Sequence, residues 1–310
     1  MKYLQTTIIQ PFCLSGIGVH SGQFITTRVE PSGVNTGICF WREDISVQDN
    51  KIQATIDNTV NAQLCTRIEN QAGIGINTIE HFMSALFAMG IDNANIFVDG
   101  PEMPILDGSA DPIIKALLNA GQKQYSHGVK YLHILKSVSI DGEDGSWAQI
   151  EPASDLQISL HIDFPDDGIG QQQVDYSFTP TSYIEQIAPA RTFCMMRDVV
   201  NMQRAGLAQG GSLENAIVVD NGKILNDGGL RMENECVNHK VLDCLGDLFL
   251  SGMLVSGKIK AFKPGHALTV SLMKMLLADK SSYEIRTYTE DTPRAGGYVQ
   301  FPKVAAAVSA

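Results

Sequence analysis

The sequence predicts an α+β fold made of two similar domains. The chain has 310 residues, enough for two domains of ordinary size, each with its own core. In both halves, short β-branched and aromatic runs punctuated by glycine precede an amphipathic helical pattern. The polar stretch 122–128 is the best candidate linker. We therefore place the domains at 1–126 and 127–310, each with a sheet layered by helices.

Composition excludes several classes of function. The net charge of -11 argues against a general nucleic-acid binder, although local lysines and arginines can still receive a small anionic substrate. The six cysteines contain no Cys-x-x-Cys pair, which favours reduced thiols over a zinc ribbon or a disulfide framework. Neither a signal-peptide apolar region nor a run of about 18 apolar residues is present. We expect a cytoplasmic protein without an integral membrane segment.

The first half opens with antiparallel strands between Thr6 and Phe40, and a further strand is expected at 54–60. An amphipathic helix follows, with apolar residues at 79, 82, 83, 86 and 87 and with Gly90 as its stop. Asn77 is a suitable N-cap, and Glu80 stands at the capping-box position three residues later. Glu80 therefore has a structural explanation as well as a catalytic one.

His81 follows in the first turn of that helix. The positive end of the helix dipole there disfavours an imidazolium and favours a neutral ring that can bind a metal. A glutamate directly before such a histidine is also placed to act as a general base on water.

A proline-rich loop at 100–112 then leads to a short helix from Ile113 to Ala120. In the second half, strands are expected at 129–134, 138–140, 147–150 and 156–164. The pattern becomes helical between 182 and 211 and is rich in methionine and valine, which fits either a core or an apolar passage. Residues 216–219 return to strand.

The most informative stretch is 239–247. At 100° per residue, His239, Asp243 and Asp247 fall within about 80° of one another on a helix, opposite an apolar face. A histidine and an aspartate one turn apart can bind the same zinc ion, but a solvated polar face explains the spacing equally well unless a third ligand exists. His266 lies in a Pro-Gly turn, a polar and exposed setting in which its imidazole can titrate.

The chain contains the segments SGIGVHSG (15–22), TIEH (78–81), PEMPILDGS (101–109), ARTF (190–193), HKVLD (239–243), GDL (246–248) and GHAL (265–268). Together they resemble a known family, the zinc-dependent UDP-3-O-(3-hydroxyacyl)-N-acetylglucosamine deacetylases of Gram-negative bacteria. The resemblance covers nearly the whole chain. It implies two α+β domains with the active site between them, and an insert in each domain.

The resemblance also assigns a metal site. It implies that His81, His239 and Asp243 bind one catalytic zinc ion, with water in the open fourth position. Iron(II) can occupy similar nitrogen and oxygen sites. His81 then supplies the third ligand that the helix at 239–247 requires.

The implied reaction is hydrolysis of an acetamide, a committed step of lipid A synthesis. Glu80 removes a proton from water, and Thr192 helps to stabilise the oxyanion. His266 protonates the leaving amine while Asp247 orients it and keeps it charged, unless Glu80 delivers that proton itself. Lys240, beside a metal ligand, is a further catalytic candidate that can also meet a diphosphate.

The resemblance places the substrate, a UDP-linked acylated amino sugar, along the second insert at about 190–218. The implied contacts are Phe164 to uracil, Lys263 to the diphosphate, Cys65 at the pocket edge, and an acyl passage lined by Phe193, Met195, Val199 and Ala208. Ser146 stands where some relatives carry a lysine, and Asp166-Asp167 also departs from the usual local pattern. The nucleotide end is therefore less well defined than the zinc end.

Two other functions compete with this one. The first is a different metal amidohydrolase on the same fold, acting on another acyl-amino sugar. The second is a non-catalytic sensor of nucleotide sugars with a structural metal. Under each of them we expect a small-molecule ligand, no nucleic acid and a monomer.

Overall fold

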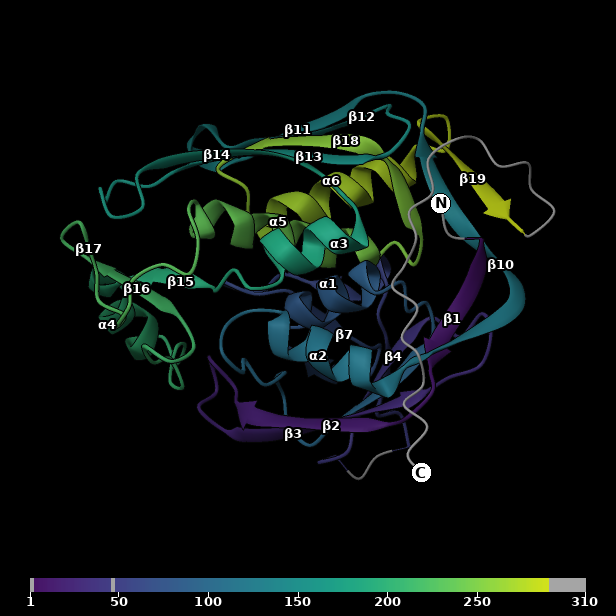
Figure 1. Cartoon of the computed structure of the whole chain (residues 1–310), viewed down its shortest axis with the longest axis horizontal. Helices are drawn as coiled ribbons and strands as arrows, with labels where there is room; N and C mark the ends of the chain where they lie inside the picture. The colour runs from purple at the N-terminus through teal and green to yellow at the C-terminus, as the bar shows by residue number, and fades with distance from the viewer. Residues whose placement is uncertain (1–2, 46–47, 290–310) are drawn as a thin grey trace.

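The computed structural model describes residues 3–45 and 48–289. The chain forms four layers, a sheet, two central layers of helices, and a second sheet (Figure 1). Helices α1 and α2 lie on the side of the lower sheet, and α3, α5 and α6 lie under the upper sheet (Figure 1). The predicted α+β class is confirmed.

The lower sheet has the order β2-β3-β9-β4-β5, and its strands pair antiparallel except for β4 with β9. Its strands are β2 (Phe12–Ile17), β3 (Phe24–Pro31), β4 (Ile38–Arg42), β5 (Lys51–Gln53) and β9 (Ala94–Val98). The helices on its inner face are α1 (Glu80–Ala88) and α2 (Asp111–Ala120). Gly90, predicted to end α1, and Gly121, which directly follows α2, both have positive φ.

A small sheet inserted in the first half has the order β6-β7-β8. Its strands are β6 (Thr59–Val60), β7 (Arg67–Glu69) and β8 (Gly75–Ile76), and the short helix η1 (Ile56–Asn58) precedes them. The predicted strand at 54–60 is therefore wrong over most of its length, because Ile56–Asn58 form a helical turn with Ile56 buried and only Thr59–Val60 are strand.

The upper sheet is built around β18, which pairs antiparallel with β12 and parallel with β10 and β13. Its strands are β1 (Leu4–Ile8), β10 (Gln122–Ile134), β11 (Val138–Asp141), β12 (Trp147–Glu151), β13 (Leu156–Asp163), β14 (Gln171–Ser177), β18 (Leu254–Phe262) and β19 (Tyr283–Tyr288). The helices in this half are η2 (Glu143–Gly145), α3 (Pro180–Ser182), η3 (Tyr183–Ile187), α5 (Glu235–Phe249) and α6 (His266–Ala278).

The stretch predicted as a linker is a strand. Residues 122–128 form the first half of β10 and pair antiparallel with β1, and the same strand continues into the upper sheet beside β18 and β19 (Figure 1). Its polar side chains are largely exposed, so polarity here marks a solvent-facing strand. The boundary at 126/127 falls inside β10, and the division into two domains stays a prediction; residues 290–310 of the second domain lie outside the described residues.

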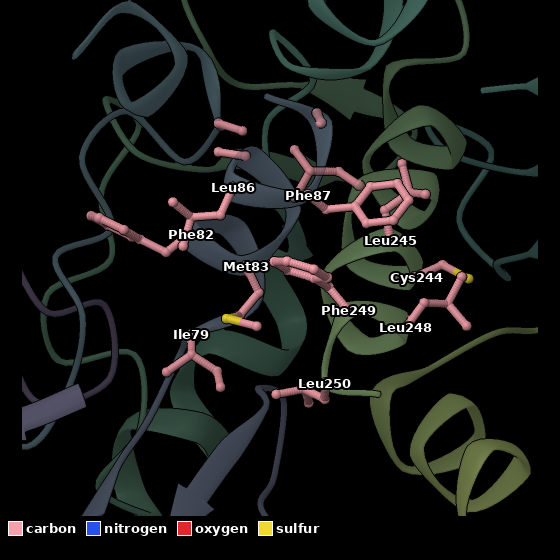
Figure 2. Packing of buried hydrophobic residues seen from close by; sticks show 14 of the residues in the cluster. Ile79, Phe82, Met83, Leu86, Phe87, Cys244, Leu245, Leu248, Phe249 and Leu250 are labelled. Atoms are coloured by element: carbon pink, nitrogen blue, oxygen red, sulfur yellow. The ribbon is translucent and has the colours of Figure 1, made fainter. Parts of the chain in front are cut away.

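The two halves meet where α1 packs against α5. Figure 2 shows Phe87 and Met83 of α1 facing Phe249 and Leu245 of α5 in one apolar cluster. Gly246 permits this close approach, because a Cβ at that position would lie 2.1 Å from the Glu80 carbonyl oxygen. Glycine in α5 thus sets the distance between the two helices that carry the predicted metal ligands.

The second-half insert projects from the layers at the left of Figure 1. It contains β15 (Phe193–Met195), α4 (Met196–Arg204), β16 (Ile217–Asp220) and β17 (Lys223–Ile224), which form a three-stranded sheet with one helix. The expected return to strand near 216–219 is confirmed. The helical pattern predicted across 182–211 holds for η3 and α4 but is interrupted by β15. No described helix is both long enough and apolar enough to cross a membrane.

Candidate active site

Helices α1 and α5 bring together the three predicted metal ligands. One ligand atom from each of His81, His239 and Asp243 lies within 4.8 Å of the others. Asp243 Oδ1 is 3.7 Å from His81 Nε2 and 3.4 Å from His239 Nε2. His239, Asp243 and Asp247 are only 2%, 5% and 1% exposed, which excludes a solvated face on α5.

The protonation states of these ligands suit metal binding. Burial lowers the pKa of His81 to about 3, aided by repulsion from His239. Burial likewise lowers the pKa of His239. For Asp243 burial acts in the opposite direction, but Lys240 and the neighbouring histidines outweigh it and hold the pKa of the carboxyl far below its usual range. The site therefore offers two neutral imidazoles and one carboxylate.

Two further observations fit a metal ion at this position. Asp243 Oδ1 is buried and has no hydrogen-bond partner among the described residues, although such an atom normally has one. His239 Nδ1 lies 3.0 Å from the Ala190 carbonyl oxygen, which can only accept, so Nδ1 carries the proton and Nε2 presents its lone pair to the site. His81, His239 and Asp243 can thus hold a metal ion, with two nitrogen donors and one oxygen donor.

Glu80 lies beside this cluster, and its side chain does not cap helix α1. Helix α1 begins at Glu80 itself with Ile79 as N-cap, and no side chain caps it. The predicted Asn77 capping box is wrong, because Thr78 has a left-handed backbone (φ 59°) that delays the start of the helix. Instead, Glu80 Oε2 accepts a hydrogen bond from the Thr66 N–H at 3.0 Å. Burial raises the pKa of Glu80 to about 7, near the value that suits a general base.

His266 is buried more deeply than the sequence predicts. The Pro-Gly turn leads directly into α6, whose first residue is His266, and its side chain is only 13% exposed. Its Nδ1 is 3.0 Å from Asp247 Oδ2, and its Nε2 is 3.7 Å from Glu80 Oε1. Burial lowers the pKa of His266, but the carboxylates of Asp247, Glu80 and Asp243 outweigh it and raise the pKa to about 9. The imidazolium form is therefore favoured, as the prediction for Asp247 requires.

Thr66 is a site residue that sequence reasoning missed. Its backbone N–H holds Glu80, its hydroxyl donates to Asp247 Oδ1 at 2.5 Å, and the same hydroxyl lies 3.0 Å from His266 Nδ1. One threonine thus contacts both candidate proton-transfer groups and the carboxylate that orients one of them. Its only sequence signal is its position directly after Cys65, which identifies no partner.

A cavity of about 870 Å³ adjoins this cluster and extends along the insert. The predicted site residues that line it are Glu80, His81, Phe164, Thr192, Phe193, Met195, Val199, Ala208, His239, Lys240, Asp243, Lys263 and His266. Asp247 lies behind His266 instead. Cys65 also lies outside the lining, where burial raises the pKa of its thiol to about 12, although its neighbour Leu64 faces the cavity.

The two predicted lysines are already engaged in ion pairs. Lys240 Nζ lies 2.8 Å from Asp243 Oδ2 and 5.7 Å from the centre of the Phe193 ring. Lys263 Nζ lies 3.3 Å from Asp163 Oδ2. The Phe193 ring packs edge-on against Phe164, with 5.2 Å between ring centres. Both lysines nevertheless line the cavity, where an anionic ligand can meet them.

Fold and site together define an α+β protein with a candidate metal centre and two candidate proton-transfer groups beside an apolar cavity. Residues 5–278 match the model of the family described as LpxC, UDP-3-O-acyl N-acetylglycosamine deacetylase. The chain belongs to this deacetylase family.

Similar proteins from three bacteria carry the name UDP-3-O-acyl-N-acetylglucosamine deacetylase. The one from Mannheimia succiniciproducens is 38% identical, over 95% of this chain and 96% of its own. Those from Phenylobacterium zucineum and Shewanella frigidimarina are 39% and 40% identical, over 94% and 93% of this chain and 99% and 94% of their own. The likeness therefore extends over nearly the full length of each relative.

Proposed function

We propose that this chain hydrolyses the N-acetyl group of UDP-3-O-acyl-N-acetylglucosamine, giving acetate and the free amine, as a committed step of lipid A synthesis. We further propose that His81, His239 and Asp243 hold a catalytic zinc ion. The observation that carries both proposals is Asp243 Oδ1, which has no hydrogen-bond partner in the described part of the chain and is buried between two neutral histidines, close to Glu80 and His266.

A bound zinc ion would activate water and polarise the amide carbonyl. Glu80 accepts the proton of the attacking water, because its Oε2 is anchored by the Thr66 N–H and its pKa of about 7 permits both states near neutral pH. Thr192, which lines the cavity, supplies a hydroxyl to the developing oxyanion.

An amine leaves readily only when it is protonated. His266 is the favoured donor, because Asp247 bonds its Nδ1 and leaves Nε2 on the cavity side. Glu80 Oε1, 3.7 Å from that nitrogen, is the alternative donor if one carboxyl serves as both base and acid. Lys240 acts beside them by neutralising the Asp243 carboxylate and by contributing positive charge next to the reacting group.

The cavity accounts for the rest of the substrate. Met195, Val199 and Ala208 line its insert side and suit an acyl chain, with Phe193 between them and the metal ligands. Elsewhere in the lining, Lys263 and Phe164 suit the diphosphate and the uracil. Cys65 is buried behind this lining, so we assign it a role in packing at the pocket edge.

An acetate-release assay combined with metal analysis tests the proposal. Protein stripped with a chelator is expected to be inactive and to recover with about one equivalent of zinc, as a mononuclear site requires. A parallel reconstitution with iron(II) under anaerobic conditions decides between the two metals. Recovery with magnesium alone contradicts the assignment, since magnesium prefers oxygen ligands.

Two comparisons separate this function from its alternatives. If the cavity receives an acyl chain, a substrate without the 3-O-acyl group loses much of its kcat/KM, whereas a hydrolase of another acyl-amino sugar shows no such loss. A sensor with a structural metal has no catalytic turnover, so Glu80→Ala and His266→Ala have no activity to abolish.

We also propose that the enzyme is cytoplasmic, because a substrate with a charged diphosphate does not cross membranes unaided. We further propose that it is a monomer. Light scattering during gel filtration and cell fractionation test these two points.

A further inference from the structure

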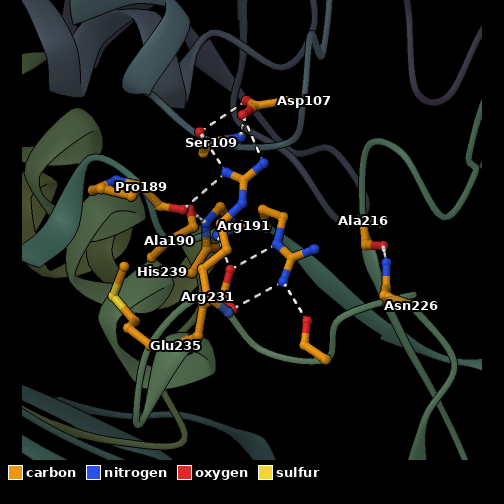
Figure 3. Close-up of polar contacts among 12 residues, drawn as sticks. Asp107, Ser109, Pro189, Ala190, Arg191, Ala216, Asn226, Arg231, Glu235 and His239 are labelled. Atoms are coloured by element: carbon orange, nitrogen blue, oxygen red, sulfur yellow. Dashed lines mark hydrogen bonds and ion pairs between the residues drawn. The ribbon is translucent and has the colours of Figure 1, made fainter.

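A buried ion pair lies directly behind the candidate metal site. Arg191, in the segment before β15, donates from Nε to Glu235 Oε1 at 2.8 Å and from Nη2 to Glu235 Oε2 at 3.1 Å. Glu235, the first residue of α5, is fully buried, and Arg191 is 7% exposed. Figure 3 shows both side chains next to Ala190 and His239. Neither residue reaches the cavity lining, so the proposed chemistry does not use them directly.

The pair binds the backbone of the segment as well as its side chain. Glu235 Oε1 also accepts the Arg191 backbone N–H at 3.1 Å, and Oε2 accepts the Arg231 N–H at 2.6 Å. Arg231 in turn donates to the Pro189 carbonyl at 3.1 Å and pairs with Asp107 at 2.9 Å (Figure 3). Residues on both sides of Ala190 are therefore anchored by charged groups.

Glu235 and His239 are four positions apart and project from the same face of α5. His239 Nδ1 donates to the Ala190 carbonyl, and Glu235 bonds the next residue along the same segment. The helix thus contacts residues 190 and 191 at two points one turn apart. Any shift of Arg191 relative to Glu235 moves the carbonyl that determines which His239 nitrogen carries the proton.

Stability alone is a weak reason for such a pair. Removing two charges from water often costs more than their attraction returns, and apolar residues of similar volume commonly replace a buried pair without loss. A backbone carbonyl that orients a metal-binding histidine, by contrast, needs accurate placement.

We propose that Arg191 and Glu235 are positioning residues for the metal site, which hold the Ala190 carbonyl against His239 Nδ1 and thereby set the tautomer and direction of the imidazole. This inference rests on the proposed function, because it gives the orientation of His239 a purpose. Thr192, the next residue after Arg191, is held at the cavity wall by its own N–H, which donates to the Gly108 carbonyl at 2.8 Å.

The primary test is nitrogen NMR of the metal-free protein, with the His239 signals assigned by comparison with His239→Ala. The wild type is expected to carry its His239 proton on Nδ1. In Glu235→Gln the amide NH₂ meets two other donors, Arg191 Nη2 and the Arg231 N–H, and cannot accept from them. The segment at residues 190–191 is then expected to shift, and the His239 signals become those of a tautomer mixture. Zinc affinity, measured by competition with a chelator, is expected to fall about 10- to 100-fold, the range found when an outer partner of a ligand is lost.

A matched control is available in the other half of the molecule. Arg42, 8% exposed, makes the same two-point contact with Asp44 at 2.8 and 2.6 Å. Asp44→Asn removes the carboxylate of this pair, whose side chain is 31% exposed against 0% for Glu235, and is expected to leave the His239 tautomer and the zinc affinity unchanged. If the two variants change zinc affinity equally, the effect is general destabilisation and the proposal is wrong.

The double variant Arg191→Met with Glu235→Leu covers the case in which Glu235→Gln fails to fold, because it leaves no unpaired charge. It is expected to fold, to show mixed tautomers and to bind zinc more weakly. A double variant with wild-type zinc affinity and a purely Nδ1-protonated His239 overturns the proposal. The His239 tautomer is measured without metal. A wild-type protein that binds no zinc therefore contradicts the proposed function, and the NMR comparison of the variants still tests the role of Arg191 and Glu235.

Discussion

At the scale of single residues, the site depends on side chains that hold other side chains. Thr66 illustrates this, because its hydroxyl bonds Asp247 while its N–H bonds Glu80. Neither contact is required for the fold of β7, since Arg67–Glu69 makes the strand pairs. The threonine is therefore expected to act on rate more than on stability.

Thr66→Val keeps the shape of the side chain but removes the donor to Asp247. An unsatisfied buried acceptor costs about 1–3 kcal/mol, which corresponds to a roughly 5- to 150-fold loss in kcat if the cost falls on the transition state. Steady-state kinetics of acetate release measure this, and KM is expected to change little. Thr66→Ser is the control and should restore most of the rate. A variant with wild-type kcat would show that the hydroxyl contributes nothing to proton transfer.

Asp247→Asn is expected to change the pH dependence of the reaction. Burial lowers the pKa of His266, and Asp247 is the largest of the carboxylates that raise it to about 9. A general acid is active only while protonated, so activity falls as pH rises through its pKa. Removing the Asp247 charge lowers that pKa and moves the alkaline limb of the kcat profile to lower pH. An alkaline limb that stays in place would assign the acid role to Glu80.

At the scale of elements, α5 carries two different functions one turn apart. Asp243 faces the histidines, whereas Asp247 faces His266. Asp243→Ala is therefore expected to lose more metal affinity than the roughly 10- to 100-fold typical of an outer partner. Asp247→Ala should keep its metal and lose rate. Metal content after gel filtration, measured together with kcat, distinguishes the two, and equal metal loss in both variants would contradict this division.

The spacing of α1 and α5 gives a second prediction at this scale. Alanine usually stabilises a helix by about 1 kcal/mol relative to glycine. At Gly246 the added Cβ would lie 2.1 Å from the Glu80 carbonyl oxygen, so the helices must separate. We expect Gly246→Ala to destabilise the protein by roughly 1–3 kcal/mol, the usual effect of overpacking, and to weaken metal binding. Chemical denaturation measures the first effect, and a variant as stable as the wild type would disprove the close approach.

At the scale of the whole molecule, the metal ligands join the two halves. His81 comes from the lower helical layer, and His239 and Asp243 come from the upper one. A metal that binds only the folded chain stabilises it by about 4 kcal/mol when its free concentration is 1,000 times Kd. Calorimetry is thus expected to show a higher Tm with zinc than after chelation. His81→Ala serves as the control, and an equal shift in that variant would place the zinc elsewhere.

Some local features were predictable from the sequence because their signals are local. The spacing of His239, Asp243 and Asp247 and the apolar periodicity near residues 79–87 both follow from helix geometry. The methionine and valine pattern between 182 and 211 fitted either a core or an apolar passage, and only the structure places Met195, Val199 and Met202 in the cavity wall. Four predictions failed where the local sequence signal was misleading. Residues 122–128 pair with β1, residues 56–58 form a helical turn, Thr78 delays the start of α1, and α6 begins directly at His266.

The sequence by itself determined which chemical groups the molecule has and which of them share a helix face, since helical periodicity depends only on order along the chain. Only the tertiary structure decided how the groups meet. His81 reaches Asp243 because α1 packs on α5 at Gly246, and Thr66, 181 positions from Asp247, bonds it across the interface between the halves. Burial lowers the pKa of His81 and His239, so that both are neutral, and raises the pKa of Glu80. It is likewise a property of that packing and of no single segment.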